Sequence, residues 1–308
     1  IDGCPVGCLG IPEFGTDFVI QMVVDTKPQS LSDLIRISGL SHGTDVWLNN
    51  AQELIRSGKA TISSCICTRD DIMTYLINKG LDSEESFTIM ERVRKGAVAK
   101  GKCKEWPEFK KDMAAHDVPD WYVWSCEQIK YMFPKAHAAA YVMMAYRIAY
   151  CKINYPLAYY AAYFGIRADA FSYELMCRGK EQLNYYINDY KRRSNTLSKK
   201  EQDTLKDMKI VQEMYARGLE FVPIDLYKAK ATKFLIIDGK LMPPFSSIEG
   251  MGDKAAEAVE AASADGPYLS RDDFRQRTKV SKTVIDLMNE LGLFEGIPES
   301  NQLSLFDL

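Results

Sequence analysis

Hydrophobic side chains recur every three to four residues over most of this chain, the spacing of amphipathic helices. The longest such stretch runs from Pro134 to Tyr155 and contains neither Gly nor Pro after its first residue. Pro134 fixes φ at a helix start, where its missing N–H is no loss. The pattern therefore predicts a helix of roughly 20 residues. His137, Tyr141, Met144 and Ile148 fall on one face of it.

Shorter helices are predicted on both sides, from apolar spacing and from capping residues. Gly39 is expected to end the first of them, which makes residues 41–45 a polar, turn-prone loop. Thr68 opens another as N-cap, with Asp71 as its capping partner. The predicted helical ranges are 31–39, 68–80, 83–95, 119–132, 171–193, 198–217, 270–277 and 281–291, with 171–193 and 198–217 antiparallel, and an Ala-rich helix is predicted to end at Ala262.

One segment has the pattern of a β-hairpin. Lys233–Ile237 and Lys240–Met242 flank Asp238-Gly239, a dipeptide typical of two-residue hairpin turns. The predicted fold class is therefore mostly α, with a multi-helix region followed by a small α+β region and a disordered C-terminal peptide. The expected domains are a helical region 1–165, a helical connector 166–232, a small region 233–297 and a tail 298–308.

The composition is that of an ordinary globular protein, with 46% hydrophobic and 26% charged residues among 308. The net charge of −3 provides no global basic field, so a nucleic-acid partner would have to bind local patches. No apolar run of membrane-spanning length and no signal peptide occur, and the eight scattered cysteines match no four-ligand zinc spacing. We expect a reduced, cytoplasmic protein without a membrane partner. Because the chain begins at Ile1 in what resembles a loop, we expect a piece of a longer protein.

Lys135 and His137 fall in the first turn of the long predicted helix, beside unpaired backbone N–H groups and the positive end of the helix dipole. Cations are unfavourable there, and a bound phosphate would relieve the conflict. The alternative is a buried helix whose Lys and His simply lie at its exposed end. A second basic group, Arg92, Arg94 and Lys95, suits the negative end of its own helix, so phosphate binding and solvation both remain open.

The segment after the hairpin contains a compact glycine pattern. Gly250 and Gly252 allow a tight turn and a close approach of backbone to a ligand, and an Ala-rich helix follows. This is the helix-hairpin-helix pattern, whose backbone N–H groups hold a DNA phosphate without reading sequence. Lys254 adds a positive charge. A plain helix-loop-helix turn is the alternative, and we favour DNA binding.

The tail has apolar side chains at Leu303, Leu305 and Phe306. A disordered tail has no reason of its own to expose them, so a pocket on a partner is the economical explanation. Gln302 supplies an amide that orients the peptide, and Ser304 completes the pentapeptide.

Several stretches together carry a family resemblance. Residues 302–306, Gln-Leu-Ser-Leu-Phe, resemble the pentapeptide by which bacterial polymerases dock on the sliding clamp. Residues 133–141, Phe-Pro-Lys-Ala-His-Ala-Ala-Ala-Tyr, resemble the fingers signature of the C-family replicative polymerases. Four further stretches resemble the PolC-type subclass of DNA polymerase III α subunits, at residues 9–16, 37–47, 69–73 and 118–122.

The resemblance implies a C-terminal portion of such an enzyme, with fingers at 1–165, a duplex-binding region at 233–297 and a clamp-binding tail. The implied partners are the primer–template duplex, an incoming dNTP, the sliding clamp (β subunit) and the remaining replicase subunits. The implied nucleotide-binding residues are Lys135, His137, Arg92, Arg94, Lys95, Arg69, Ser41 and His42. The implied DNA-binding residues are Gly250, Gly252 and Lys254, and the clamp-binding residues are Gln302, Leu303, Ser304, Leu305 and Phe306.

In this family the polymerising aspartates and their Mg²⁺ ions lie in a palm upstream of the fingers. No catalytic residue and no metal ligand are therefore expected in this chain, and Asp71 is interpreted as a capping residue. A DNA polymerase fragment inactive on its own is the favoured reading. The first alternative is a non-catalytic DNA-binding and clamp-tethering module, and the second is a translesion or repair polymerase.

Overall fold

The structure, a computed structural model, describes residue 1 and residues 4–300. Contacts divide the chain into two compact units, one of residues 2–149 and one of residue 1 with residues 150–308. Fifteen α-helices and one two-stranded sheet, with a few short 3₁₀ and π turns, form the regular structure of this described part. The predicted fold class, mostly α with a small α+β region, is confirmed.

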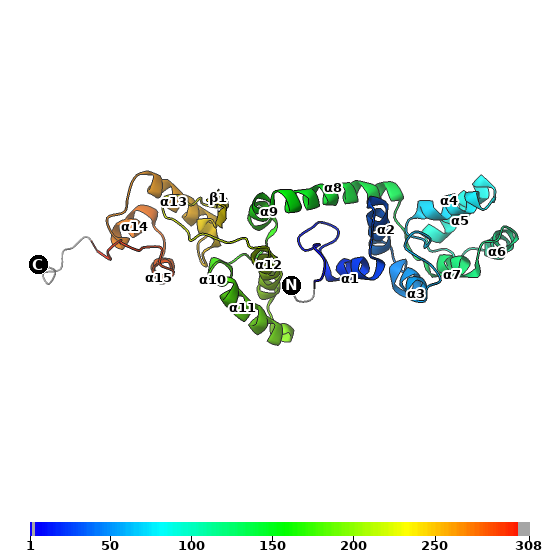
Figure 1. Cartoon of the computed structure of the whole chain (residues 1–308), viewed down its shortest axis with the longest axis horizontal. Coiled ribbons are helices and arrows are strands. Elements are labelled where there is room, and N and C mark those ends of the chain that lie inside the picture. Colours follow the sequence, from blue (N-terminus) through cyan, green and yellow to red (C-terminus); the bar gives the residue numbers. More distant parts are fainter. Residues whose placement is uncertain (2–3, 301–308) are drawn as a thin grey trace, which may run out of the picture. The chain divides into compact units, whose positions relative to one another are not determined.

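The helices of the unit of residues 2–149 are joined by loops, and its described part contains no strand longer than one isolated β-bridge, between Thr44 and Tyr131. In Figure 1, α4 and α5 lie side by side within it. The long helix α8 contributes its residues up to Ala149 here and its last turn to the other unit. The helices are α1 (Asp17–Thr26), α2 (Leu31–His42), α3 (Gln52–Arg56), α4 (Arg69–Asn78), α5 (Ser83–Arg94), α6 (Trp106–Ala115), α7 (Asp120–Gln128) and α8 (Lys135–Asn154).

Helix α2 runs through Gly39 and ends at His42. The prediction that Gly39 stops this helix, and that Ser41 and His42 lie in a loop, is therefore wrong. Gly39 instead permits close packing, because a methyl group there would lie 2.6 Å from the carbonyl oxygen of Cys67. The backbone before α4 thus passes directly against α2.

The predicted cap of α4 is confirmed. The backbone N–H of Thr68 donates to Asp71 Oδ2 at 2.8 Å in a capping box. The predicted length of α8 is confirmed as well, since the helix begins directly after Pro134 and spans 20 residues.

The unit of residues 150–308 combines helices with a short antiparallel hairpin. Asp238 and Gly239 both have positive φ, at 50° and 76°, as a type I′ turn requires, so the hairpin prediction is confirmed. The elements are α9 (Pro156–Ala162), α10 (Tyr173–Met176), α11 (Lys180–Arg192), α12 (Lys199–Ala216), β1 (Leu235–Ile237), β2 (Lys240–Met242), α13 (Asp253–Ala264), α14 (Arg271–Thr278) and α15 (Lys282–Glu290).

Two helices replace the single one predicted over 171–193. Gly179, with φ at +100°, separates α10 from α11 because few other residues adopt that conformation. Helices α11 and α12 are antiparallel as predicted. Gln212 donates to Asn184 at 2.9 Å, and Arg193 near the end of α11 donates to Glu201 near the start of α12 at 3.1 Å.

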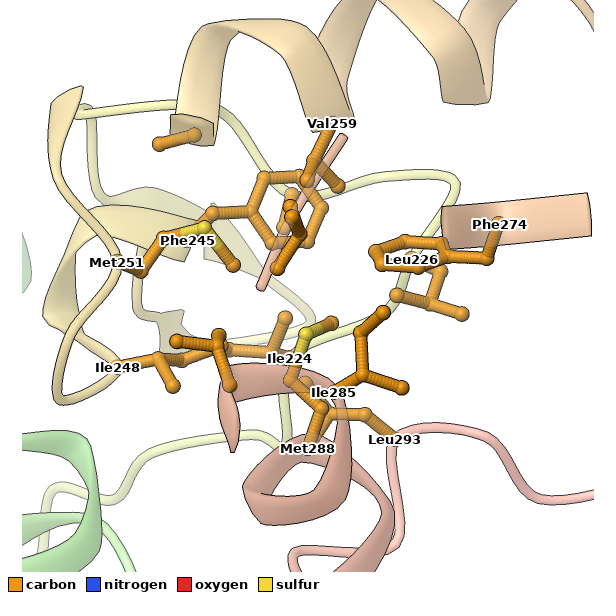
Figure 2. Close-up of a cluster of buried hydrophobic side chains, with 14 of the residues drawn as sticks. Ile224, Leu226, Phe245, Ile248, Met251, Val259, Phe274, Ile285, Met288 and Leu293 are labelled. Carbon is orange, nitrogen blue, oxygen red and sulfur yellow. The ribbon is translucent and has the colours of Figure 1, made fainter. Parts of the chain in front are cut away.

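The C-terminal helices share one hydrophobic core (Figure 2). Phe245, Phe274 and Met288 are fully buried in it. Ile248 and Met251, on either side of Gly250, also reach this core and anchor the turn that precedes α13. The glycine turn is therefore held by apolar side chains, while its backbone is available at the surface.

Candidate functional site

The candidate nucleotide site is built around a short extended segment between α7 and α8. Helix α7 ends at Gln128, four residues earlier than predicted, so residues 130–134 are free to pair with neighbouring backbone. Backbone hydrogen bonds fix this segment near the ends of three helices, among them Thr44 N to Tyr131 O at 2.9 Å, Met132 N to Arg94 O at 3.2 Å, and Arg69 N to Phe133 O at 3.2 Å.

Aromatic rings gather on this segment and on the first turns of α8. The Phe133 ring stacks on His137 with centroids 5.0 Å apart, and His137 contacts Tyr141 at 4.6 Å. The imidazole of His42 meets the edge of Phe133 at 5.7 Å and lies 6.5 Å from His137. The structure thus brings His42, from α2, to the two aromatic side chains at the start of α8.

The first turn of α8 already has an anion beside it. Asp70 Oδ2 accepts a hydrogen bond from the backbone N–H of Lys135 at 2.7 Å. Asp70 and Asp71 therefore cap different helices, α8 and α4, as expected for adjacent residues that point to different sides. The electrostatic conflict inferred from the sequence is relieved at least in part by the protein itself.

The predicted cations of this site differ in whether a carboxylate already forms an ion pair with them. The ammonium group of Lys135 is exposed, and neither it nor the Arg69 guanidinium has an ion-pair partner within the described ranges. Arg92, in contrast, pairs with Glu105 at 3.0 Å. Lys135 and Arg69 are therefore the cations best placed to meet an added anion without losing an internal one.

Glu91 forms ion pairs with the other two cations of the basic cluster, Arg94 and Lys95. Its carboxylate pairs with the Arg94 guanidinium and, at 2.8 Å, with the Lys95 ammonium. Hydrogen bonds from Arg94, more than those from Lys95, lower the pKa of Glu91 to about 2. The structure keeps this cluster near the site, because Arg94 O holds Met132, but its charge is partly compensated.

The remaining predicted residues on α2, Ser41 and His42, already have polar partners within the protein. The Ser41 hydroxyl donates to the carbonyl oxygen of Ser38 at 3.0 Å, and His42 Nδ1 lies 2.8 Å from the same oxygen. His42 Nε2 faces Glu13 Oε2 at 2.8 Å. Both nitrogens of His42 are therefore occupied within the protein.

The face of α8 chosen from the sequence is not its core face. Tyr141 and Met144 are 50% and 54% exposed. Ala138, Val142 and Ala145 are buried instead, because small residues let α8 approach its neighbours closely. The four residues share one face as predicted, and this face is exposed at Tyr141 and Met144, so the alternative of a buried helix does not describe it.

The turn before α13 contains two glycines, Gly250 and Gly252, which differ in backbone conformation and in the space around them. Gly250 has φ at +80°, and a methyl group on it would lie 3.1 Å from Val284 Cγ2. Gly252 is the N-cap of α13 with φ at −70°, and a methyl group there would meet no atom within 4 Å in the described part of the chain. Gly250 is needed by the fold, whereas nothing described within the chain requires glycine at Gly252. Lys254, in the first turn of α13, is exposed.

Two further predictions concern the tail and metals. The expected clamp-binding residues Gln302, Leu303, Ser304, Leu305 and Phe306 lie outside the described residues. Within residues 4–300, no group of three or more His, Cys, Asp or Glu side chains is arranged to hold a metal ion. No helix of that part is long and apolar enough to cross a membrane.

Two family models match the chain. Residues 5–117 match the bacterial DNA polymerase III alpha subunit finger domain, and residues 218–303 match a helix-hairpin-helix motif. A PolC-type DNA polymerase III of Caldanaerobacter subterraneus is 53% identical over 304 residues, which is 99% of this chain. The chain is homologous to a segment of PolC-type DNA polymerase III.

Two other PolC-type relatives match the chain with similar identity over a similar length. Those of Clostridium perfringens and Bacillus subtilis are 53% and 50% identical over 304 residues each. The chain spans 21% of the length of these relatives. The family expected from the sequence is confirmed, and the fingers match covers α1–α6 in the unit that holds the candidate nucleotide site.

Two site residues escaped the sequence reasoning. Asp70 has no predicted role in the sequence analysis, yet it caps α8 from 65 residues away. Glu13 lies in the stretch 9–16 that resembles the family and has no predicted role, yet it faces His42. Neither partnership follows from local spacing, because both contacts are made between separate elements.

Proposed function

We propose that this chain is the fingers, duplex-binding and clamp-docking segment of a cytoplasmic PolC-type replicative DNA polymerase. The segment binds the incoming dNTP and the primer–template duplex, and its tail tethers the enzyme to the sliding clamp among the other replicase subunits. The observation that supports the nucleotide role best is the gathering of five predicted residues around Phe133: Ser41, His42, Arg69, Lys135 and His137.

The triphosphate is assigned to Lys135 and Arg69. Their charged groups carry no ion pair within the described ranges, and the exposed side chain of Lys135 can donate a charge-assisted hydrogen bond to a phosphate. Arg92, Arg94 and Lys95 would contribute less, since their own carboxylate partners already engage them and offset most of their charge. The exposed face of α8 near Tyr141 would support the base of the nucleotide.

Chemistry would be divided between this segment and the rest of the polymerase. Phosphoryl transfer depends mainly on positioning and on stabilising charge. We assign the polymerising aspartates and their Mg²⁺ ions to the palm, outside this segment. The segment alone is then expected to be inactive, and it supplies cations and the surface that receives the nucleotide.

Duplex DNA is assigned to the turn at Gly250, Gly252 and Lys254. The open space beside Gly252 and the exposed ammonium of Lys254 suit one backbone phosphate of DNA. The slope of log K against log salt is negative for DNA binding. Replacing Lys254 by Ala should make it shallower by about 0.9, which corresponds to the counterions released at one phosphate contact. An unchanged slope would remove Lys254 from the interface.

The nucleotide role is tested in a complete PolC-type polymerase that carries this segment. Lys135→Ala should raise KM for the incoming dNTP on the order of tenfold or more, because a charge-assisted hydrogen bond to phosphate is lost. Lys111→Ala, which removes only a surface ion pair with Glu108 on α6, is the matched control.

This experiment also separates the rival function. A non-catalytic tethering module predicts that Lys135→Ala and Arg69→Ala leave KM unchanged while clamp and duplex binding persist. The pairing of Arg92, Arg94 and Lys95 with glutamates is the observation that favours this rival.

A further inference from the structure

Glu13 and His42 form a contact that joins the N-terminal loop to the end of α2. Glu13 Oε2 lies 2.8 Å from His42 Nε2, and the Glu13 side chain is only 19% exposed. This oxygen is buried, and no group within the described ranges makes a hydrogen bond of normal geometry to it, so its 2.8 Å contact with His42 Nε2 is an ion-pair contact. Within those ranges, this contact with the imidazole is the ion pair that can compensate the buried carboxylate oxygen.

The other nitrogen of His42 defines the hydrogen positions. Nδ1 lies 2.8 Å from the carbonyl oxygen of Ser38, which can only accept, so Nδ1 carries a hydrogen. The Ser41 hydroxyl gives its hydrogen to that same carbonyl and can only accept from Nδ1. With Nε2 facing a carboxylate, both ring nitrogens are surrounded by acceptors. The arrangement suits an imidazolium, which has two N–H donors.

The backbone of Glu13 adds an independent observation. Its φ is +70°, in the left-handed region that disfavours residues with a Cβ. The loop around it is tightly packed, since Ile11 and Phe14 are buried and a methyl group on Gly15 would lie 3.1 Å from Ile11 O. A glycine would adopt the Glu13 conformation more easily, so the carboxylate is held in place at a cost in backbone strain.

We propose that Glu13 is a positioning residue of the candidate nucleotide site. Its carboxylate holds His42 as an imidazolium in one orientation, and the His42 ring then supports Phe133 and His137 at the start of α8. This inference rests on the proposed nucleotide role, and it extends that role to a residue whose side chain does not meet the nucleotide.

The geometry also assigns His42 an indirect role. Because Glu13 Oε2 and Ser38 O each lie 2.8 Å from one of its nitrogens, His42 is poorly placed to offer an N–H to a phosphate. It acts through its ring, which meets the edge of Phe133 at 5.7 Å. Loss of Glu13 frees the ring to rotate, and the stack of Phe133 on His137 loses its lateral support.

The first test reads the protonation of His42 in the full 308-residue chain. Nitrogen-15 NMR distinguishes protonated from bare imidazole nitrogens, and the three histidines can be assigned with His116→Asn and His137→Asn. At neutral pH, wild-type His42 should show two protonated nitrogens. Glu13→Gln and Glu13→Gly should each leave one bare nitrogen, while Asp25→Asn, which breaks the ion pair with Arg56, should not.

Glu13→Gly keeps this test interpretable if Glu13→Gln folds poorly. Glycine relieves the left-handed strain, so this variant removes the carboxylate without penalising the backbone. Two protonated nitrogens in both variants, or one bare nitrogen in the wild type, would overturn the proposal.

The second test measures nucleotide use in a complete PolC-type polymerase that carries this segment. Both Glu13 variants should raise KM for dNTP on the order of tenfold through misplacement of the site, with a smaller effect on kcat. If Lys135→Ala raises KM but the Glu13 variants do not, this inference fails and the proposed function stands. If Lys135→Ala also has no effect, the proposed nucleotide role itself fails.

Discussion

The carboxylate of Asp70, in the first turn of α4, accepts a hydrogen bond from the backbone N–H of Lys135, the first residue of α8. The bond of 2.7 Å caps α8 from another helix, and no residue preceding α8 has to do so. One side chain therefore sets the start of the long helix and places a negative charge beside the Lys135 backbone.

This contact predicts a stability change confined to the unit of residues 2–149. Asp70→Ala should lower its free energy of unfolding by about 1 kcal/mol, the usual cost of removing a cap, and Asp70→Asn, which keeps an acceptor, by less. All four tryptophans, Trp47, Trp106, Trp121 and Trp124, lie in this unit. Urea unfolding followed by tryptophan fluorescence therefore reports it separately. Equal midpoints for Asp70→Ala and the wild type would contradict the capping role.

Local signals in the sequence predicted the elements that depend on local interactions. Pro134 sets the start of α8, Asp71 caps α4, and Asp238-Gly239 sets the hairpin turn, each through contacts within a few residues. The pattern failed where packing decides. Gly39 looks like a helix stop, but the nearby Cys67 carbonyl is what requires glycine there.

The sequence predicted which residues belong to the candidate site, but not which carboxylates they contact. Lys135, His137, Arg69 and His42 were named, and the structure brings them to one segment. Their carboxylate partners were missed, because Glu13 and Asp70 approach from distant positions in the chain. Charge counts along a helix cannot reveal such partners, which decide how much of a basic cluster is available to a ligand.

Asp207 predicts a pH dependence of stability in the unit of residues 150–308. It lies in α12, is 3% exposed, and accepts a hydrogen bond from Ala170 N at 2.8 Å. Burial raises the pKa of Asp207 to about 6, above the ordinary 3.8. Because the folded state binds the proton more tightly, the stability that this group contributes is present below pH 3.8 and is lost as pH rises through 6.

Asp207→Asn should therefore stabilise this unit at pH 8, by about 3 kcal/mol, since the amide keeps an acceptor for Ala170 without burying a charge. The gain should disappear near pH 4, where wild-type Asp207 is mostly protonated. Hydrogen exchange of the α12 amides at the two pH values measures it. A gain that does not change between pH 4 and pH 8 would exclude titration of Asp207 as its cause.

The tail gives a prediction about clamp binding. Leu305→Ala combined with Phe306→Ala should abolish retention of the chain on an immobilised sliding clamp, because the apolar anchors of the peptide are lost. Asn301→Ala, just before the pentapeptide, is the control and should bind normally. Normal retention of the double variant would refute the assignment of residues 302–306.

The two glycines before α13 give opposite predictions from the same substitution. Gly250→Ala forces a Cβ into the left-handed region and against Val284, so it should destabilise the C-terminal core by about 1 kcal/mol or more. Gly252→Ala has room for its methyl group and an ordinary φ, so stability should be unchanged. On duplex DNA, the added methyl group at Gly252 should instead block the close approach of a phosphate and weaken binding severalfold.

The comparison needs both measurements on both variants. Thermal unfolding gives stability, and salt titrations of a fluorescent duplex give affinity. Gly252→Ala that folds normally but binds more weakly would locate the DNA backbone at this turn, since a merely structural glycine would lose stability first. Unchanged binding by Gly252→Ala would leave Gly252 without a ligand-related role and would move the duplex contact elsewhere on this unit.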